Sequence, residues 1–225
     1  MVNYRDFQPA ATSRRRENIE WSIRYAFNER DTAAPRLLLI GDSICNGYHA
    51  RVREMLAEHA NITYWASSRC VTDPAYFREL DFLLDDGRYD LVSFNNGLHS
   101  LSTERSEWEA AYRAAAEFIR AKCPEAKLSL TLCTPLKDPA KDAVVRELNA
   151  FTRALAEELE LPVIDLYTPL DALDKEEHMA DVYHWKDAGR ELQAEIICAH
   201  AAKQLHFSGG NVQLATETGP DGAMR

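Results

Sequence analysis

The chain has 225 residues, of which 46% are hydrophobic and 28% are charged. This length and composition suit one folded α/β domain and exclude a fibrous or wholly disordered chain. The formal net charge is −10, and such an acidic surface repels the phosphate groups of nucleic acids and of anionic membranes. We therefore expect neither nucleic acid nor a membrane among the partners.

The sequence contains no apolar run of about 18 residues, which a membrane-spanning helix would need. The stretch 1–21 lacks the apolar segment of a secretory signal peptide. The five cysteines form no C-x-x-C pair, and their odd number disfavours a disulfide framework and a structural zinc site. Free thiols fit a reducing compartment, so for a chain that begins here we expect a cytoplasmic location.

In chain order, an extra N-terminal helix is predicted over 14–28. Apolar runs and segments with helical spacing then alternate along the chain. The strands are expected at 36–40, 62–65, 90–94, 127–133 and 162–167, and the helices at 49–60, 74–87, 106–123, 139–160 and 186–205. Residues 208–225 are polar, rich in glycine and without a period, which predicts a poorly ordered tail.

Strands that alternate with helices predict a parallel sheet with helices on both faces. We therefore expect residues 1–207 to form a single domain, a three-layer α/β/α sandwich around a five-stranded parallel sheet. In such sheets, ligands bind in the crevice beyond the carboxyl ends of the strands. The loops that follow the first, third and fifth strands are therefore where functional residues are expected.

The segment GDSICNG follows the first predicted strand and contains Ser43. Gly41 permits a tight turn, and the N-terminus of the following helix would favour negative charge at Ser43. Ser43 is therefore either a nucleophile or simply the residue that caps the helix. The segment is not a P-loop, because no lysine follows Gly47, and it is not a G-x-S-x-G elbow, because Cys45 replaces the second glycine.

A serine hydroxyl needs a base within hydrogen-bonding reach, and seven histidines are available. His184 lies after the fifth predicted strand, and Asp181 precedes it by three residues. In a turn, this spacing can bring the carboxylate to one imidazole nitrogen while the other nitrogen faces the crevice. The positions after the first and last strands favour a Ser43–His184–Asp181 triad over an Asp181 helix cap beside a surface histidine.

Four short blocks resemble those of the SGNH (GDSL-type) hydrolases and span about residues 36 to 200. They read LLLIGDSICNGY, YDLVSFNNGLHSL, TLCTPLKDP and DVYHWKDAG. The resemblance implies a flavodoxin-like topology and ester hydrolysis without a cofactor or metal. It also implies that Ser43 is the nucleophile, His184 the base, and Asp181 the acid that orients the base.

The third-strand block departs from the family pattern at the position of the oxyanion-binding asparagine. His99 stands there, and a histidine N–H can replace an amide donor. Asn96 or Asn95, at the end of the strand, is the alternative donor. A third possibility is that the His99 imidazole only holds the loop together.

The block after the second strand lacks the glycine whose backbone N–H usually completes the oxyanion hole. The loop 66–74 reads ASSRCVTDP, so we expect this donor among the N–H groups of residues 68–70. The side chain of Arg69 is a further candidate for contact with a substrate oxygen or anion.

These patterns predict a serine esterase that removes a small acyl group, in the first place acetyl, from a carbohydrate or another polar alcohol. The NNGLH block beside GDSI resembles that of SGNH proteins similar to carbohydrate esterases. Tyr48, Trp65 and Trp185 lie near the strand ends, where they either stack on a sugar ring or pack in the core. The alternatives are an acyltransferase with the same triad, a non-catalytic binding protein and, more remotely, a metallohydrolase.

Overall fold

Six strands form one sheet in the order β1-β3-β2-β4-β5-β6. The computed structural model describes residues 2–9 and 12–207, so the predicted tail 208–225 lies outside the described residues. The strands are β1 (Ser22–Ala26), β2 (Arg36–Gly41), β3 (Asn61–Ser67), β4 (Leu91–Phe94), β5 (Lys127–Thr131) and β6 (Val163–Ile164). Strands β2 to β6 are parallel to their neighbours, as expected, whereas β1 pairs antiparallel with β3.

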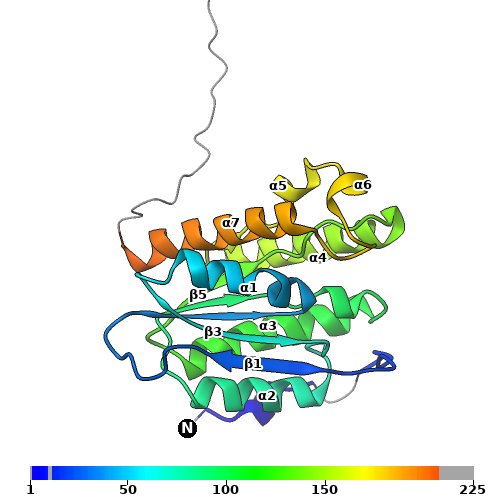
Figure 1. Cartoon of the computed structure of the whole chain (residues 1–225). Helices are drawn as coiled ribbons and strands as arrows, with labels where there is room; N and C mark the ends of the chain where they lie inside the picture. The colour runs from blue at the N-terminus through cyan, green and yellow to red at the C-terminus, as the bar shows by residue number, and fades with distance from the viewer. Residues whose placement is uncertain (1, 10–11, 208–225) are drawn as a thin grey trace, which may run out of the picture.

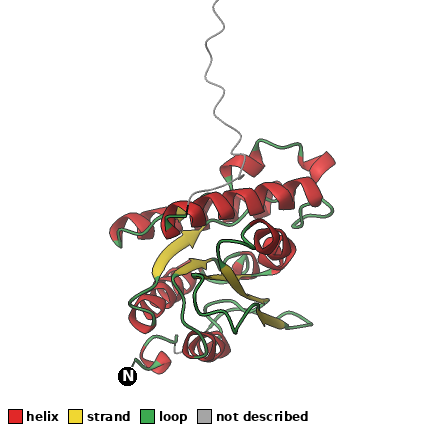
Figure 2. Ribbon diagram, turned by 60° about the vertical axis from the view of Figure 1, so that its left-hand side comes forward, coloured by secondary structure: helices red, strands yellow, loops and turns green. Residues whose placement is uncertain are grey.

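Helices cover both faces of the sheet, which confirms the predicted α/β/α sandwich (Figure 1). One face is covered by α1 (Ser43–Met55) and α7 (Asp187–Leu205). The other is covered by α2 (Pro74–Asp85), α3 (Arg105–Lys122) and α4 (Pro139–Glu158). The turned view in Figure 2 shows helices on the two sides of the strands. The remaining helical segments are short: η1 (Tyr4–Asp6), η2 (Leu98–Ser100), α5 (Thr168–Asp171) and α6 (Lys175–His178).

The apolar run of β2 lies at the centre of two hydrophobic clusters. Because successive side chains of a strand point to opposite faces, Leu37 and Leu39 pack under α1 and α7. Leu38 and Ile40 pack under α2 and α3 instead. A strand covered on both faces needs an apolar residue at every position, which is why this segment reads as an unbroken apolar run.

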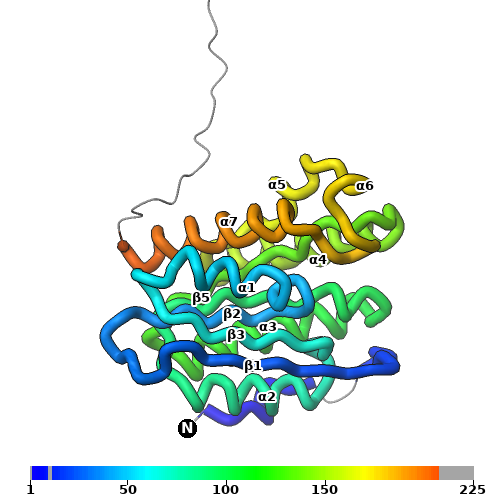
Figure 3. Tube along the Cα trace, viewed as in Figure 1, coloured from blue at the N-terminus to red at the C-terminus, as the bar shows by residue number. Residues whose placement is uncertain are grey.

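The predicted helix over 14–28 is wrong. Residues 22–26 form β1, which lies beside β3 (Figure 3). In this pair Ile23 is opposite Ala66 and Tyr25 is opposite Tyr64. Apolar side chains at positions 21, 23, 25 and 27 have the two-residue period of a strand, and β3 offers an edge whose backbone groups would otherwise lack partners. The sheet therefore has six strands rather than five, and residues 12–21, which we call the strap, have no helix or strand.

Two helical glycines provide a matched test of the packing around α7. A Cβ on Gly189 would lie 2.7 Å from Trp185 Cε3 and 2.8 Å from Trp185 Cβ, whereas a Cβ on Gly47 would meet only the Arg190 side chain, at 3.5 Å. Gly189→Ala should lower the free energy of unfolding by about 1–3 kcal/mol, because Trp185 must shift. Gly47→Ala should raise it by up to about 1 kcal/mol through helix propensity. Urea denaturation of both variants measures the difference, and equal effects would contradict this packing.

Candidate active site

Ser43 lies at the point where the central strand β2 turns into α1. Asp42 is the N-cap of this helix, and its Oδ1 accepts a hydrogen bond from the Ile44 N–H at 2.9 Å. A Cβ on Gly41 would lie 2.6 Å from the Cβ of Cys45, so the close approach of strand and helix requires glycine here. Because Asp42 caps the helix, the Ser43 hydroxyl is free for another partner.

The partner of Ser43 is His184. The distance between Ser43 Oγ and His184 Nε2 is 2.9 Å, and His184 Nδ1 lies 2.8 Å from Asp181 Oδ2. The other oxygen of Asp181 accepts hydrogen bonds from the backbone N–H groups of Tyr183 and His184. The turn is closed by a hydrogen bond from the Ala180 N–H to the His184 carbonyl oxygen. The structure thus joins Ser43, His184 and Asp181 in one chain of hydrogen bonds.

The carboxylate of Asp181 is held in its charged form. Burial opposes its ionisation, but hydrogen bonds from the Tyr183 N–H and from the imidazole and N–H of His184 lower its pKa to about 2. A carboxylate with this pKa remains negative at neutral pH. It therefore fixes the proton of His184 on Nδ1, which leaves Nε2 as the acceptor that faces Ser43.

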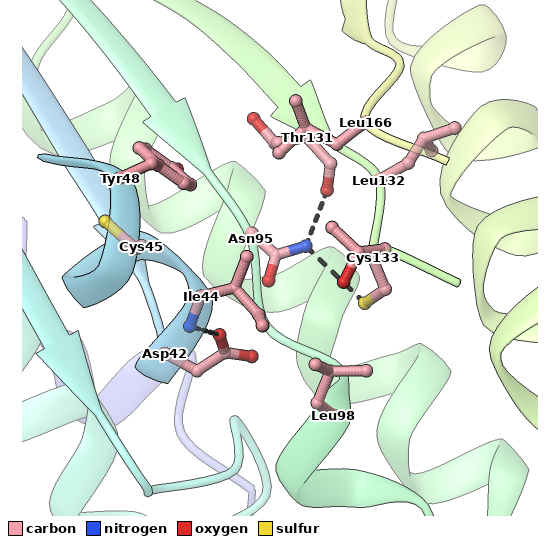
Figure 4. A pocket seen from close by; sticks show the side chains of 11 residues that line it. Asp42, Ile44, Cys45, Tyr48, Asn95, Leu98, Thr131, Leu132, Cys133 and Leu166 are labelled. Atoms are coloured by element: carbon pink, nitrogen blue, oxygen red, sulfur yellow. Dashed lines mark hydrogen bonds between the residues drawn. The ribbon is translucent and has the colours of Figure 1, made fainter. Parts of the chain in front are cut away.

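Asp42 has a different environment, although it is adjacent to Ser43 in sequence. Its side chain is buried, and burial raises the pKa of this carboxyl, while the nearby His99 and His184 oppose the rise. Its Oδ2 has no hydrogen-bond partner among the described residues. This carboxyl lines a cavity of about 10 Å³ between α1 and the ends of β4 and β5, which Figure 4 shows with Asn95 and Cys133. The cavity holds at most a water molecule, so it is not the substrate site.

A larger pocket, of about 550 Å³, opens over the Ser43–His184 pair. Its volume lies in the usual range for small-molecule sites. The lining residues come from the strap, α1, η2 and the turn before α7; they are Glu17, Trp21, Ser43, Leu98, His99, Tyr183 and His184. The pocket therefore combines the nucleophile and base candidates with aromatic walls and a second histidine.

The three candidate oxyanion side chains have different positions. His99 lines the pocket, and its Nδ1 lies 2.5 Å from Glu17 Oε1. Asn96 is buried outside it; its amide donates to the Arg69 carbonyl oxygen and accepts from the Val71 N–H, so it holds the loop after β3. Asn95 donates to the Thr131 carbonyl oxygen. Of the three, only His99 is brought beside Ser43 and His184.

The loop after β3 leaves one of its three candidate N–H groups without an acceptor. The Ser68 N–H donates to the Trp21 carbonyl oxygen, and the Arg69 N–H donates to Ser67 Oγ. No acceptor for the Cys70 N–H is found in the described part of the chain. The Arg69 guanidinium does not line the pocket, because it is paired with Glu79 at 2.6 Å and with Asp73 at 3.1 Å.

The aromatic walls of the pocket are residues that the sequence did not single out. Tyr48, Trp65 and Trp185 are buried and pack in the core. Trp21 and Tyr183 line the pocket instead, and the Tyr183 hydroxyl accepts a hydrogen bond from Lys141 Nζ at 2.6 Å. The available signals were the two-residue period that begins at Trp21 and the position of Tyr183 directly before His184.

The residues that the structure describes offer no obvious ligand set for a metal. Within 2–9 and 12–207, no three histidine, cysteine, aspartate or glutamate side chains are grouped so as to hold an ion. In the same residues, no helix has the length and apolar character needed to cross a bilayer.

Several solved structures share this fold. An acetylxylan esterase from Geobacillus stearothermophilus has a TM-score of 0.63 at 17% identity, covering 78% of this chain and 95% of its own. An alpha/beta hydrolase enzyme from the metagenome of Lake Arreo has a TM-score of 0.63 at 16% identity, covering 75% and 95%. A GDSL-like lipase from Parabacteroides merdae has a TM-score of 0.61 at 17% identity, covering 76% of this chain and 96% of its own.

The sequence comparisons identify the family. No curated protein matched the chain. The model of the GDSL-like lipase/acylhydrolase family matches residues 39–192, which begins in β2 and ends in α7 and so includes Ser43, Asp181 and His184. The chain belongs to the GDSL-like lipase/acylhydrolase family and is a carboxylic-ester hydrolase.

Proposed function

We propose that this hydrolase is a serine esterase that removes a small acyl group, acetyl in the first place, from a carbohydrate or another polar alcohol. The observation that carries the proposal is the continuous hydrogen-bonded chain from Asp181 through His184 to Ser43, of which His184 and Ser43 line the pocket. This arrangement is the one a serine needs to become a nucleophile. It also favours a catalytic protein over a binding protein on the same fold.

In the proposed reaction, Ser43 Oγ attacks the ester carbonyl carbon while His184 Nε2 accepts its proton. Asp181 stabilises the resulting imidazolium, because its low pKa keeps it negative. His184 then returns the proton to the leaving alcohol oxygen, which leaves an acyl group on Ser43. A water molecule, deprotonated by His184, attacks this acyl-enzyme and releases the carboxylic acid together with the free serine.

The negative oxygen of the tetrahedral intermediate needs hydrogen-bond donors near Ser43. The first N–H groups of a helix have no partner within the helix, and we assign the Ser43 N–H at the start of α1 as the first donor. The Cys70 N–H is the candidate from the loop after β3, since its two neighbours already have acceptors. His99 is the candidate side-chain donor, while Asn96 holds the loop that carries Cys70.

Two observations support an acylated polar alcohol as the substrate. Trp21 and Tyr183 present aromatic surface, and Glu17 and His99 present hydrogen-bonding groups, in the same pocket; sugars bind to such combinations of stacking and polar contact. The Geobacillus neighbour is an acetylxylan esterase, and its catalytic mutants replace a serine, a histidine and an aspartate. That aspartate precedes the histidine by three positions, as Asp181 precedes His184.

Replacement of the nucleophile tests the mechanism. Ser43→Ala should lower kcat for p-nitrophenyl acetate by about 10⁴-fold or more, because the hydroxyl that forms the acyl-enzyme is removed. Thermal unfolding should change little, since Asp42 rather than Ser43 caps α1. The exposed Ser102 provides a matched control, and Ser102→Ala should retain full activity. Substantial hydrolysis by folded Ser43→Ala would contradict the assignment.

The substrate class is tested with a panel of esters. We expect kcat/KM to be highest for acetyl esters among p-nitrophenyl esters of increasing acyl length, and acetylated xylose or xylooligosaccharides to be hydrolysed. Trp21→Ala should raise KM for acetylated sugars by about 10-fold while changing KM for p-nitrophenyl acetate less, because one stacking contact is lost. A preference for long acyl chains, or equal effects of Trp21→Ala on both substrates, would overturn the carbohydrate assignment.

A further inference from the structure

We propose that Glu17 is a positioning residue for the oxyanion site, which orients the His99 imidazole in the pocket that also contains Ser43. This inference rests on the proposed serine-esterase function. It concerns a residue of the strap, which lies before the stretch 39–192 that the family model matches. The strap thus adds to the family fold a carboxylate that acts on the histidine in place of the usual asparagine.

The strap is fixed to the rest of the molecule by Arg14, whose side chain is 2% exposed. Its guanidinium donates to the Ser68 carbonyl oxygen at 2.8 Å and is paired with Glu20 at 3.0 Å. Its Nε also donates to the carbonyl oxygen of His99 at 3.4 Å. One buried arginine therefore joins the strap to the loop after β3 and to the segment that carries His99.

A second set of hydrogen bonds holds the strap where it enters β1. The Trp21 N–H donates to Ser68 Oγ at 2.9 Å, and Ser68 Oγ donates to Glu20 Oε2 at 2.7 Å. Glu20 Oε1 in turn accepts from the backbone N–H of Glu17 at 3.0 Å. The backbone of Glu17 is therefore tied to the same loop that supplies the Cys70 N–H.

The His99 ring is held on two sides by this strap. Glu17 Oε1 lies 2.5 Å from His99 Nδ1, and the ring of Trp21 meets the His99 ring edge-on, with centroids 6.1 Å apart. The His99 side chain is 16% exposed, so the ring keeps limited access to solvent. Glu17, Trp21 and His99 all line the pocket that contains Ser43.

The chemistry of this contact determines what His99 can do. An ionised carboxylate only accepts hydrogen bonds, so the proton in the Glu17–His99 contact belongs to Nδ1. His99 can then donate from Nε2 only when both ring nitrogens are protonated, which makes it a cation. The Glu17 carboxylate opposite Nδ1 fixes the plane of the ring, so this donor is held in place before negative charge develops on the substrate oxygen.

Other charged groups surround the same ring. Asp42, the N-cap of α1, interacts electrostatically with His99 and also with His184. Arg14 approaches the backbone of His99 rather than its ring. Glu17 is therefore the acid in direct hydrogen-bond contact with the imidazole. In the proposed step His99 donates a hydrogen bond and keeps its proton, so the proton balance of the Ser43–His184 reaction is unchanged.

A double-mutant cycle separates positioning of His99 from support of the fold. Glu17→Gln, His99→Asn and the double variant are compared by kcat and KM for p-nitrophenyl acetate. Glu17→Gln should lower kcat by about 10-fold to 10²-fold with little change in KM, because the donor acts on the transition state. In the His99→Asn background, the same substitution should have no effect on kcat, because the imidazole ring that Glu17 orients is absent.

The control is Glu107→Gln, since Glu107 accepts from the Ser13 N–H and a glutamine oxygen can do the same; it should leave kcat unchanged. An equal loss of kcat from Glu17→Gln in both backgrounds would mean that Glu17 only supports the strap. An effect on KM alone would mean that Glu17 and His99 bind the alcohol part of the substrate. Either result overturns the proposal, whereas loss of hydrolysis in Ser43→Ala would still support the serine mechanism.

Discussion

The hydrogen bond between His184 Nε2 and Ser43 Oγ joins residues that are 141 positions apart in the chain. Ser43 would be a weak nucleophile alone, because a serine hydroxyl needs a base that accepts its proton. The fold brings the two residues together at the carboxyl edge of the sheet, because Ser43 follows β2 and His184 lies in the turn before α7. One hydrophobic cluster anchors both segments, because it contains Ile44, next to Ser43, and Trp185, next to His184.

Asp42 caps α1, so that Ser43 does not have to cap the helix and also serve as the nucleophile. A serine at the start of a helix commonly caps it by accepting a hydrogen bond from a backbone N–H, and a hydroxyl oriented for capping is not oriented to donate its proton to a base. Here the carboxylate of Asp42 accepts from the Ile44 N–H, so Ser43 keeps its hydroxyl and its backbone N–H toward the pocket. The Oδ2 atom of Asp42 is buried and has no hydrogen-bond partner among the described residues. Asp42 lines a cavity no larger than a water molecule.

The sequence was sufficient to predict the sandwich and the Ser43–His184–Asp181 grouping, because these depend on patterns within short segments. The strand β1 was mistaken for a helix, since its period-two signal follows a charged stretch and its pairing depends on the free edge of β3. The sequence pattern did not indicate that Glu17 contacts the site, because Glu17 lies in an irregular segment and its contact with His99 depends on the tertiary structure. Arg69 was expected near the substrate, but Glu79 on α2 pairs with it, which is a contact that local spacing does not specify.

The most direct measurement of the central claim is covalent labelling with a fluorophosphonate, which reacts with an activated serine and releases fluoride. The account predicts one phosphonyl group per chain, located on Ser43 by peptide mass spectrometry, with loss of esterase activity in proportion to labelling. His184→Ala should label far more slowly, because the hydroxyl loses its base. Labelling at another residue, or full activity after complete labelling of Ser43, would contradict the account.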